Sequence, residues 1–169
     1  MVTTVHREYD HLLKSVHLTK KDDLGVPTIL CSINRYYFYN NNCDTGSGVN
    51  IMAKVTYEFL YGTMPMDPTY AQLQFVDQSF RFVKGIAIDV PVQIIDHYVP
   101  TDFLIIDIGE DECDPPIILG RPFLNTTKAI FYIGIGEIHF KFLSEKVRHH
   151  FNINYIIDEE PKKNRSRRR

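Results

Sequence analysis

The chain lacks several features that mark common protein classes. It has no tryptophan and only three cysteines, Cys31, Cys43 and Cys113, none of them in a C-x-x-C pair. This odd set argues against a disulfide framework or a zinc ribbon and favours a reducing compartment. The N-terminus has no apolar signal core, and no hydrophobic run is long enough to span a bilayer. We therefore expect an intracellular protein, cytoplasmic or nuclear and not secreted, without a membrane partner.

A strong charge of one sign is also missing. Nineteen Lys and Arg residues face 21 Asp and Glu residues, which gives a net charge of -2, so the chain as a whole is not built to bind polyanions. Basic residues gather only near the end, at 161–169. We expect this tail to be disordered. It is either a solubilising tail, a linker to a polyprotein neighbour, or the one place where nucleic acid could bind.

Residues that favour β-strands are abundant. Hydrophobic residues make up 44% of the sequence and aromatic residues 12%, which is ordinary for a chain that buries a core. A length of 169 residues fits one domain with tails. Phe, Tyr, Ile and Val are plentiful, and this mix favours strands over a helical bundle.

Short apolar segments separated by Gly, Pro and Asn predict where the strands lie. We expect strands at 28–33, 36–39, 73–75, 80–82, 86–94, 103–108, 117–119 and 138–142. Residues 40–42 are three asparagines and predict a turn, and residues 53–60 predict a short helix. Pro91 lacks an amide donor and predicts an edge position for its strand.

Such a series of short strands predicts a mainly all-β fold, a small closed barrel or a sandwich, with one or two short helices. We divide the chain into three parts. Residues 1–24 form an N-terminal extension whose apolar spacing is compatible with a short helix. Residues 25–143 form the folded domain, and residues 144–169 form a charged C-terminal tail or linker.

Asp44-Thr45-Gly46 is the sharpest chemical signal in the sequence. Hydrolysis of a peptide bond without a metal or a covalent nucleophile requires a water activated by a group that both takes and gives a proton. Two carboxylates that share one proton do this, as in aspartic proteases. Gly46 allows a tight turn that brings an N–H close to the carboxylate. The Thr45 hydroxyl can donate one hydrogen bond and accept another.

Chance is the simplest alternative explanation for this triplet. From average residue usage, D-T-G occurs in roughly 3% of chains of this length. Asp and Gly are also common in loops for reasons of turn geometry alone. The triplet therefore needs support from the rest of the sequence.

That support comes from a resemblance that runs from about residue 25 to residue 142. The chain resembles the retropepsin-type protease region of gypsy-type LTR retrotransposon polyproteins from plants. The matching segments occur in the order of that family and are PTILCSI, CDTGSGVNIM, LQFVDQSFRFVKGI, YVPTDFLIIDIG and PPIILGRPFLNTTKAIFYIG. The stretch that contains them, from about residue 25 to residue 142, covers about two-thirds of the chain. The resemblance implies a retropepsin-type closed barrel.

The resemblance also implies roles for individual residues. Asp44 would be the catalytic aspartate, Thr45 would form hydrogen bonds between subunits beneath the paired carboxylates, and Gly46 would help to hold the carboxylate in plane. The hairpin at 73–82 would be the flap that closes over the substrate. The flap tip would consist of Val76, Asp77, Gln78 and Ser79. The strand that braces the catalytic loop would end at Leu119, with Gly120 packed against the loop and Arg121 beginning a short helix.

A single D-T-G triplet supplies only half of such a dyad. We therefore expect a homodimer that cleaves a polypeptide, in the first place a retrotransposon polyprotein, with one Asp44 from each subunit. The alternative is a catalytically inactive retropepsin-like module that dimerises or binds peptides, because the flap tip lacks the glycines that make retroviral flaps mobile. A third hypothesis, nucleic-acid binding through the basic tail, has least support.

No metal or other cofactor is expected. The sequence contains no H-E-x-x-H motif and no EF-hand loop. We interpret His149 and His150 as solvated side chains. Cys43 lies next to Asp44, but no motif places a His partner beside it, and we interpret it as a small apolar residue of the barrel.

Overall fold

The computed structural model describes residues 20–75, 78, 80–108 and 117–151. The expected helix in the N-terminal extension and the basic tail at 161–169 lie outside these residues. The elements of the described part are, in chain order, β1 (Thr28–Ile33), β2 (Tyr36–Cys43), β3 (Ile51–Ala53), α3 (Lys54–Tyr61), β4 (Gln72–Gln74), β5 (Phe80–Ile94), β6 (His97–Ile106), β7 (Ile117–Leu119), α4 (Arg121–Thr126), β8 (Ile130–Tyr132), the 3-10 helix η1 (Ile133–Ile135), β9 (Glu137–Phe142) and β10 (Glu145–His150).

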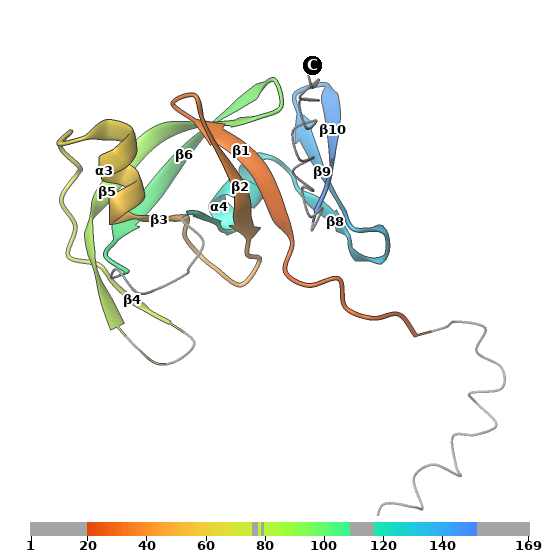
Figure 1. Cartoon of the computed structure of the whole chain (residues 1–169), viewed down its shortest axis with the longest axis horizontal. Coiled ribbons are helices and arrows are strands. Elements are labelled where there is room, and N and C mark those ends of the chain that lie inside the picture. The colour runs from red at the N-terminus through yellow and green to blue at the C-terminus, as the bar shows by residue number, and fades with distance from the viewer. Residues whose placement is uncertain (1–19, 76–77, 79, 109–116, 152–169) are drawn as a thin grey trace, which may run out of the picture.

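Six strands close into a barrel, as the sequence predicts. The hydrogen-bonded order is β1-β2-β7-β3-β6-β5, and a further pairing of β1 with β5 closes the ring. Strand β4 continues the sheet beyond β5 as an additional strand. The β4–β5 hairpin and the loop that leaves β2 project from the same end of the barrel (Figure 1). This end therefore brings together the two segments singled out from the sequence.

The β1–β2 hairpin corrects one expectation. Residues 40–42 are not a turn, because β2 continues through them to Cys43. Asn41 is fully buried, and its side-chain amide donates to the carbonyl oxygens of Ile29 at 3.0 Å and Phe38 at 2.6 Å. A run of asparagines favours turns, but here carbonyl oxygens of the β1–β2 hairpin accept hydrogen bonds from the buried Nδ2 of Asn41.

Strand β5 corrects a second expectation. It is one strand of 15 residues, pairs with β6 along most of its length and pairs with β1 at Val92 and Gln93. Pro91 therefore lies in an interior strand and not at an edge. The proline is tolerated because it faces Pro100 on β6 and lies just outside the β1 pairing, where no ladder donor is required from it.

The main core fills the barrel and extends under the C-terminal strands. Its largest fully buried side chains include Phe103, Phe123, Phe140, Met52 and Ile94. Alternation of buried and exposed positions along β5 and β9 produces this core, because successive strand residues point to opposite faces. Helix α3 covers the barrel with Thr56, Tyr57 and Leu60.

A separate three-stranded sheet, ordered β10-β9-β8, stands beside β1 and β2 on the side away from α3 (Figure 1). Residues 145–150, which the sequence analysis assigned to the charged tail, form β10 and pair with β9 from Glu145↔Phe142 to His150↔Glu137. The charged residues of this segment obscured its alternating pattern. Phe151, immediately after β10, is 5% exposed and belongs to the main core.

In the described part of the chain, neither helix is long or apolar enough to cross a lipid bilayer.

Candidate active site

Asp44 follows the last residue of β2 and is positioned by β7. The two strands are parallel, with Asn42 opposite Ile118 and Cys43 opposite Leu119. The Asp44 amide continues the ladder by donating to the Leu119 carbonyl at 3.0 Å. The backbone of Asp44 is therefore fixed by a strand that arrives from 75 residues further along the chain.

The loop after β2 folds back on the Asp44 side chain. The Gly46 amide donates to Asp44 Oδ1 at 2.8 Å, and the Ser47 amide donates to the Asp44 carbonyl at 3.3 Å. Asp44 is half-buried, whereas Thr45 and Gly46 are exposed. A Cβ on residue 46 would lie 3.1 Å from Asp44 Oδ1, which is a tight contact. The carboxylate is thus held in one orientation while it faces the open side of the loop.

Gly120 lies directly against this loop. A Cβ at position 120 would lie 2.1 Å from the Val49 carbonyl oxygen and 3.0 Å from the Ser47 carbonyl oxygen, so no other residue fits there. The next amide, that of Arg121, donates to the Ser47 carbonyl at 2.9 Å. The junction between β7 and α4 therefore packs backbone against backbone on the Asp44 loop.

The Arg121 side chain braces the same loop from its exposed side. Its Nη1 donates to the carbonyl oxygens of Thr45 at 3.2 Å and Gly46 at 2.8 Å. Helix α4 begins at Arg121, with Gly120 as its N-cap residue. Leu119 is fully buried beneath the loop. Thus the structure brings together Asp44, Thr45, Gly46, Leu119, Gly120 and Arg121, the six residues that the sequence indicated for the catalytic loop and its support.

Asn50 is a member of this site that the sequence analysis missed. It is 3% exposed, and its Oδ1 accepts the Gly120 amide at 2.8 Å while its Nδ2 donates to the Asp102 carbonyl at 3.0 Å. Its own carbonyl accepts the Leu104 amide at 2.9 Å. Asn50 therefore joins the Asp44 loop, β7 and β6. An Asn six residues after Asp44 belongs to no known motif. Its role is seen only in the structure, where it accepts the hydrogen bond of the buried Gly120 amide.

The β4–β5 hairpin forms as predicted and contacts the Asp44 side of the barrel. Gln72 pairs with Phe82 and Gln74 with Phe80. Leu73 and Phe75 pack against a second small apolar cluster. That cluster consists of Ile51, Val83 and Ile106, with Val49, Leu104, Ile108 and Ile118 packed around it. The hairpin, the Asp44 loop and β7 therefore share one apolar surface.

Of the expected flap-tip residues, only Gln78 is among the described residues; Val76, Asp77 and Ser79 lie outside them. Gln78 has a φ of 66° and donates its amide to the Phe75 carbonyl at 2.9 Å. A positive φ is unusual for glutamine and is normally occupied by glycine or asparagine. Gln78 thus has a backbone conformation that glycine adopts more readily.

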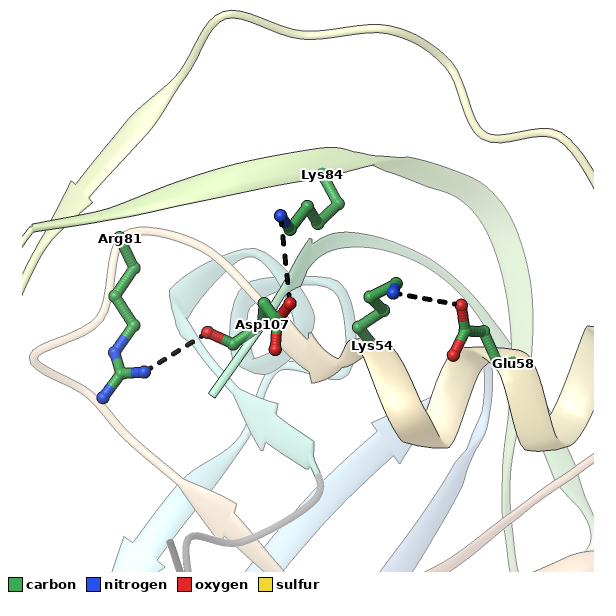
Figure 2. Close-up of polar contacts among 5 residues, drawn as sticks. All are labelled: Lys54, Glu58, Arg81, Lys84 and Asp107. Atoms are coloured by element: carbon green, nitrogen blue, oxygen red, sulfur yellow. Dashed lines mark hydrogen bonds and ion pairs between the residues drawn. The ribbon is translucent and has the colours of Figure 1, made fainter. Parts of the chain in front are cut away.

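Polar contacts attach the root of this hairpin to the end of β6. Arg81 Nη1 donates to the Asp107 carbonyl at 3.2 Å, and Lys84 Nζ lies 3.8 Å from Asp107 Oδ2 (Figure 2). The Arg81 guanidinium also lies over the Phe75 ring, 5.8 Å from its centroid. Lys54 and Glu58 form a separate exposed pair on α3 (Figure 2). Two basic residues of β5 therefore converge on Asp107, the residue that follows β6.

A surface cavity of about 650 Å³ opens beside the Asp44 loop. Its lining includes Thr45 and Gly48 from the loop, Arg121 and Leu124 from α4, and Phe131 from β8. Strand β8 pairs only with β9 in the described part of the sheet. Phe131 of this strand faces the cavity, whereas Ile130 and Tyr132 point to the opposite face and are 54% and 43% exposed.

Cys43 does not supply a thiolate nucleophile to this site. Cys43 is 3% exposed, and burial, together with the nearby Cys31 thiol, raises its pKa far above the ordinary range, so it stays a neutral thiol. This agrees with its interpretation as a small apolar barrel residue. Among the residues that the structure describes, no group of three or more His, Cys, Asp or Glu side chains could hold a metal ion.

A scan against protein-family models and a search of curated proteins found no match. Solved structures do match. The chain is similar to the retroviral protease-like domain of Ddi1 from Leishmania major, with a TM-score of 0.59 and 19% identity over 78% of this chain and 98% of that one. It is also similar to EIAV protease complexed with the inhibitor HBY-793, with a TM-score of 0.49 and 21% identity over 67% of this chain and 98% of that one. The likeness to the Ddi1 domain shows that the chain has a retropepsin-like fold.

Proposed function

We propose that this protein is an aspartic endopeptidase that acts as a homodimer, with one Asp44 from each subunit. One observation carries the proposal: a half-exposed carboxylate is held by the Gly46 amide on a loop that β7, α4 and β6 brace together. Bracing from three elements is more than a surface turn needs. It matches the requirement that a catalytic group be held within a fraction of an ångström.

The chemistry needs two such carboxylates that share one proton, because like charges a few ångströms apart do not both ionise. The ionised Asp44 takes a proton from water as the water oxygen bonds to the carbonyl carbon. The protonated Asp44 gives its proton to the carbonyl oxygen. In the second step, the carboxyl that took the water proton gives it to the amide nitrogen as the C–N bond breaks. The other carboxylate takes a proton from a hydroxyl of the tetrahedral intermediate, so the pair again holds one proton.

The surroundings of Asp44 support a second copy of the chain as the partner. The cavity bordered by Thr45, Arg121 and Phe131 opens beside β8, which pairs only with β9 among the described strands. A twofold contact places the same patch of both subunits face to face. Contact at this surface would bring the two Thr45 residues, and with them the two Asp44 carboxylates, toward one axis.

The substrate would be an extended polypeptide bound between the hairpin and the Asp44 loop. The shared apolar cluster, which includes Val49, Leu73, Phe75 and Ile118, offers apolar contacts along this space. The resemblance to plant gypsy-type sequences favours a retrotransposon polyprotein as that polypeptide, cleaved in the cytoplasm or nucleus. Nucleic acid would be a partner only through the basic residues 161–169.

A second candidate function has one observation in its favour. The expected flap tip contains no glycine, and Gln78 has a positive φ, which glutamine rarely adopts. A flap tip without glycine favours a module that dimerises or binds a peptide without cleaving it.

Cleavage of an unstructured polypeptide separates the two functions. The purified chain should cleave such a substrate at mildly acidic pH, with a specific activity that rises with protein concentration because the active species is a dimer. Asp44→Asn keeps the size of the side chain and should abolish cleavage. Equal cleavage by Asp44→Asn would show that Asp44 is not the catalytic group. Binding of the peptide by the unaltered chain without cleavage would establish the second function.

A further inference from the structure

The C-terminal sheet touches the barrel at an irregular point of β1. The β1–β2 register shifts between the pairs Ile29↔Asn41 and Cys31↔Phe38, which leaves Leu30 without a partner residue on β2. The Leu30 amide instead donates to Nε2 of His149 on β10, at 3.3 Å and across 119 residues of sequence. One imidazole nitrogen thus satisfies a strand amide that the barrel ladder does not use.

This contact requires a neutral imidazole. Nε2 accepts a hydrogen bond only through its lone pair, so the proton of the neutral ring is on Nδ1. His149 is half-buried, and its interpretation from sequence as a solvated side chain is wrong. Burial, and then the neighbouring His150, lower its pKa below the ordinary value of 6.5, which favours the acceptor form near neutral pH.

The groups that surround His149 leave it without a carboxylate of its own. On β1, residues 28–33 contain no charged side chain, and burial raises the pKa of Cys31, their single titratable group, to about 12. On β9, the carboxylate of Glu137 contacts His139 at 2.7 Å and His150 at 3.5 Å. Arg148 and His150, the neighbours of His149 on β10, add only positive charge.

We propose that His149 is an acid-sensitive joint between the C-terminal sheet and the barrel, which opens at the Leu30 contact when the imidazole is protonated. A protonated Nε2 becomes a donor that faces the Leu30 N–H donor, so the hydrogen bond is lost. The cation is also poorly solvated in this half-buried position. Opening at this point frees one end of β10 from β1.

The other contacts of the sheet persist in acid. His97 at the start of β6 bonds Glu145 at the start of β10 at 2.9 Å, and protonation of the histidine turns this contact into an ion pair. The contacts of the Glu137 carboxylate to His139 and His150 also become ion pairs when these histidines are protonated. Ile138 and Phe140 are 0% and 1% exposed and hold β9 in the core. Acid therefore breaks the contact between His149 and β1, while β10 stays paired with β9.

The sign of the pH effect follows from the lowered pKa of His149. The folded protein binds fewer protons at this site than the unfolded chain, so the stabilisation is complete above about pH 6.5. It is lost as the pH falls through the interval between 6.5 and the lower folded value. Below that value the Leu30 contact is open in the folded protein.

Hydrogen exchange of the Leu30 amide, followed by NMR on the whole chain, tests the joint without reference to protease activity. We expect the protection of this amide, corrected for its intrinsic rate, to fall about tenfold per pH unit between pH 6.5 and the lower folded pKa of His149. In His149→Gln, whose amide oxygen accepts but does not titrate, Leu30 protection should stay constant with pH. His150→Gln is the matched control: it keeps the titrating His149, so Leu30 protection should still fall in acid, with an onset at higher pH because the charge of His150 no longer lowers the pKa of His149.

Protection of Leu30 that stays constant between pH 7.5 and pH 4 in the unaltered chain would overturn the joint, as would an equal loss in His149→Gln. If His149→Gln does not fold, the imidazole nitrogen shifts of the unaltered chain decide: the joint requires an unprotonated Nε2 at neutral pH, and a protonated Nε2 there contradicts it.

Discussion

The Asp44 loop and the joint between the barrel and the C-terminal sheet are both polar, but they are held by different chemistry. The contacts that brace the Asp44 loop come from backbone amides, the side-chain amide of Asn50 and the guanidinium of Arg121. None of these groups changes protonation between about pH 4 and pH 8. The polar contacts of the C-terminal sheet, by contrast, are made by titratable side chains. These are His97, His139, His149, His150, Glu137 and Glu145.

This difference teaches how one small chain combines a site of constant geometry with a boundary that responds to pH. An enzyme that works through carboxylates needs its loop unchanged while the surrounding pH varies. Strands β9 and β10 stand beside β1 and β2, and the loop that leaves β2 runs toward β3 on the other side (Figure 1). A titration can therefore alter the sheet boundary and leave the loop in place.

Gly120→Ala should have the largest effect and should break the Asp44 loop. The new Cβ would lie 2.1 Å from the Val49 carbonyl oxygen, so backbone must move. We expect a loss of about 3 kcal/mol or more in the free energy of unfolding, measured with denaturant. Gly134→Ala is the control, because nothing lies within 4 Å of a Cβ there and the change should be within about 0.5 kcal/mol. Equal stability of both variants would refute the packing of Gly120 on the loop.

Asn50→Ala should have the second-largest effect, which should again be confined to the Asp44 loop. It leaves the buried Gly120 amide without an acceptor and the Asp102 carbonyl without its donor. An unsatisfied buried group costs about 1–3 kcal/mol, and denaturant unfolding should report a loss in this range. Asn125→Ala, at an exposed position on α4, should change little. The loss caused by Asn50→Ala should be the same at pH 7 and pH 5, since no titrating group takes part.

Glu137→Gln should have the smallest effect. It tests how far Glu137 contributes to the pH dependence of the C-terminal sheet. The hydrogen bond from His139 lowers the pKa of Glu137, with further contributions from His150 and Arg148. Its stabilisation is therefore present above about pH 4.5 and lost as the pH falls below that value. The variant should show a shallower decrease of melting temperature in this acid range. A pH profile that is unchanged by the substitution would exclude Glu137 from the joint.

Sequence reasoning predicted the barrel and most of its strands because strand residues repeat with a period of two, and the short helix at 53–60 became α3. It failed where tertiary contacts overrode local preference. Residues 40–42 form part of β2 because Asn41 finds carbonyl partners in the core. Pro91 is tolerated inside the sheet because it faces Pro100.

At the candidate site, the sequence led to the residues around Asp44 but not to what holds them. Asp44, Thr45, Gly46, Gly120 and Arg121 belong to short motifs and were found by position. Asn50 has no motif, and its contacts connect segments that are 52 and 70 residues away. His149 was missed for a similar reason, because its partner is an amide of β1, and no local pattern marks a backbone group that lacks a ladder partner.

Mixing the unaltered chain with Asp44→Asn tests most directly whether two Asp44 side chains form one site. With total protein held constant and subunits allowed to exchange, a shared dyad predicts that activity follows the square of the unaltered fraction. An equal mixture should then retain about a quarter of the activity of the unaltered dimer, because only dimers with two Asp44 residues cleave. A linear decrease, with about half of the activity left in the equal mixture, would show that each chain works alone and would contradict the account.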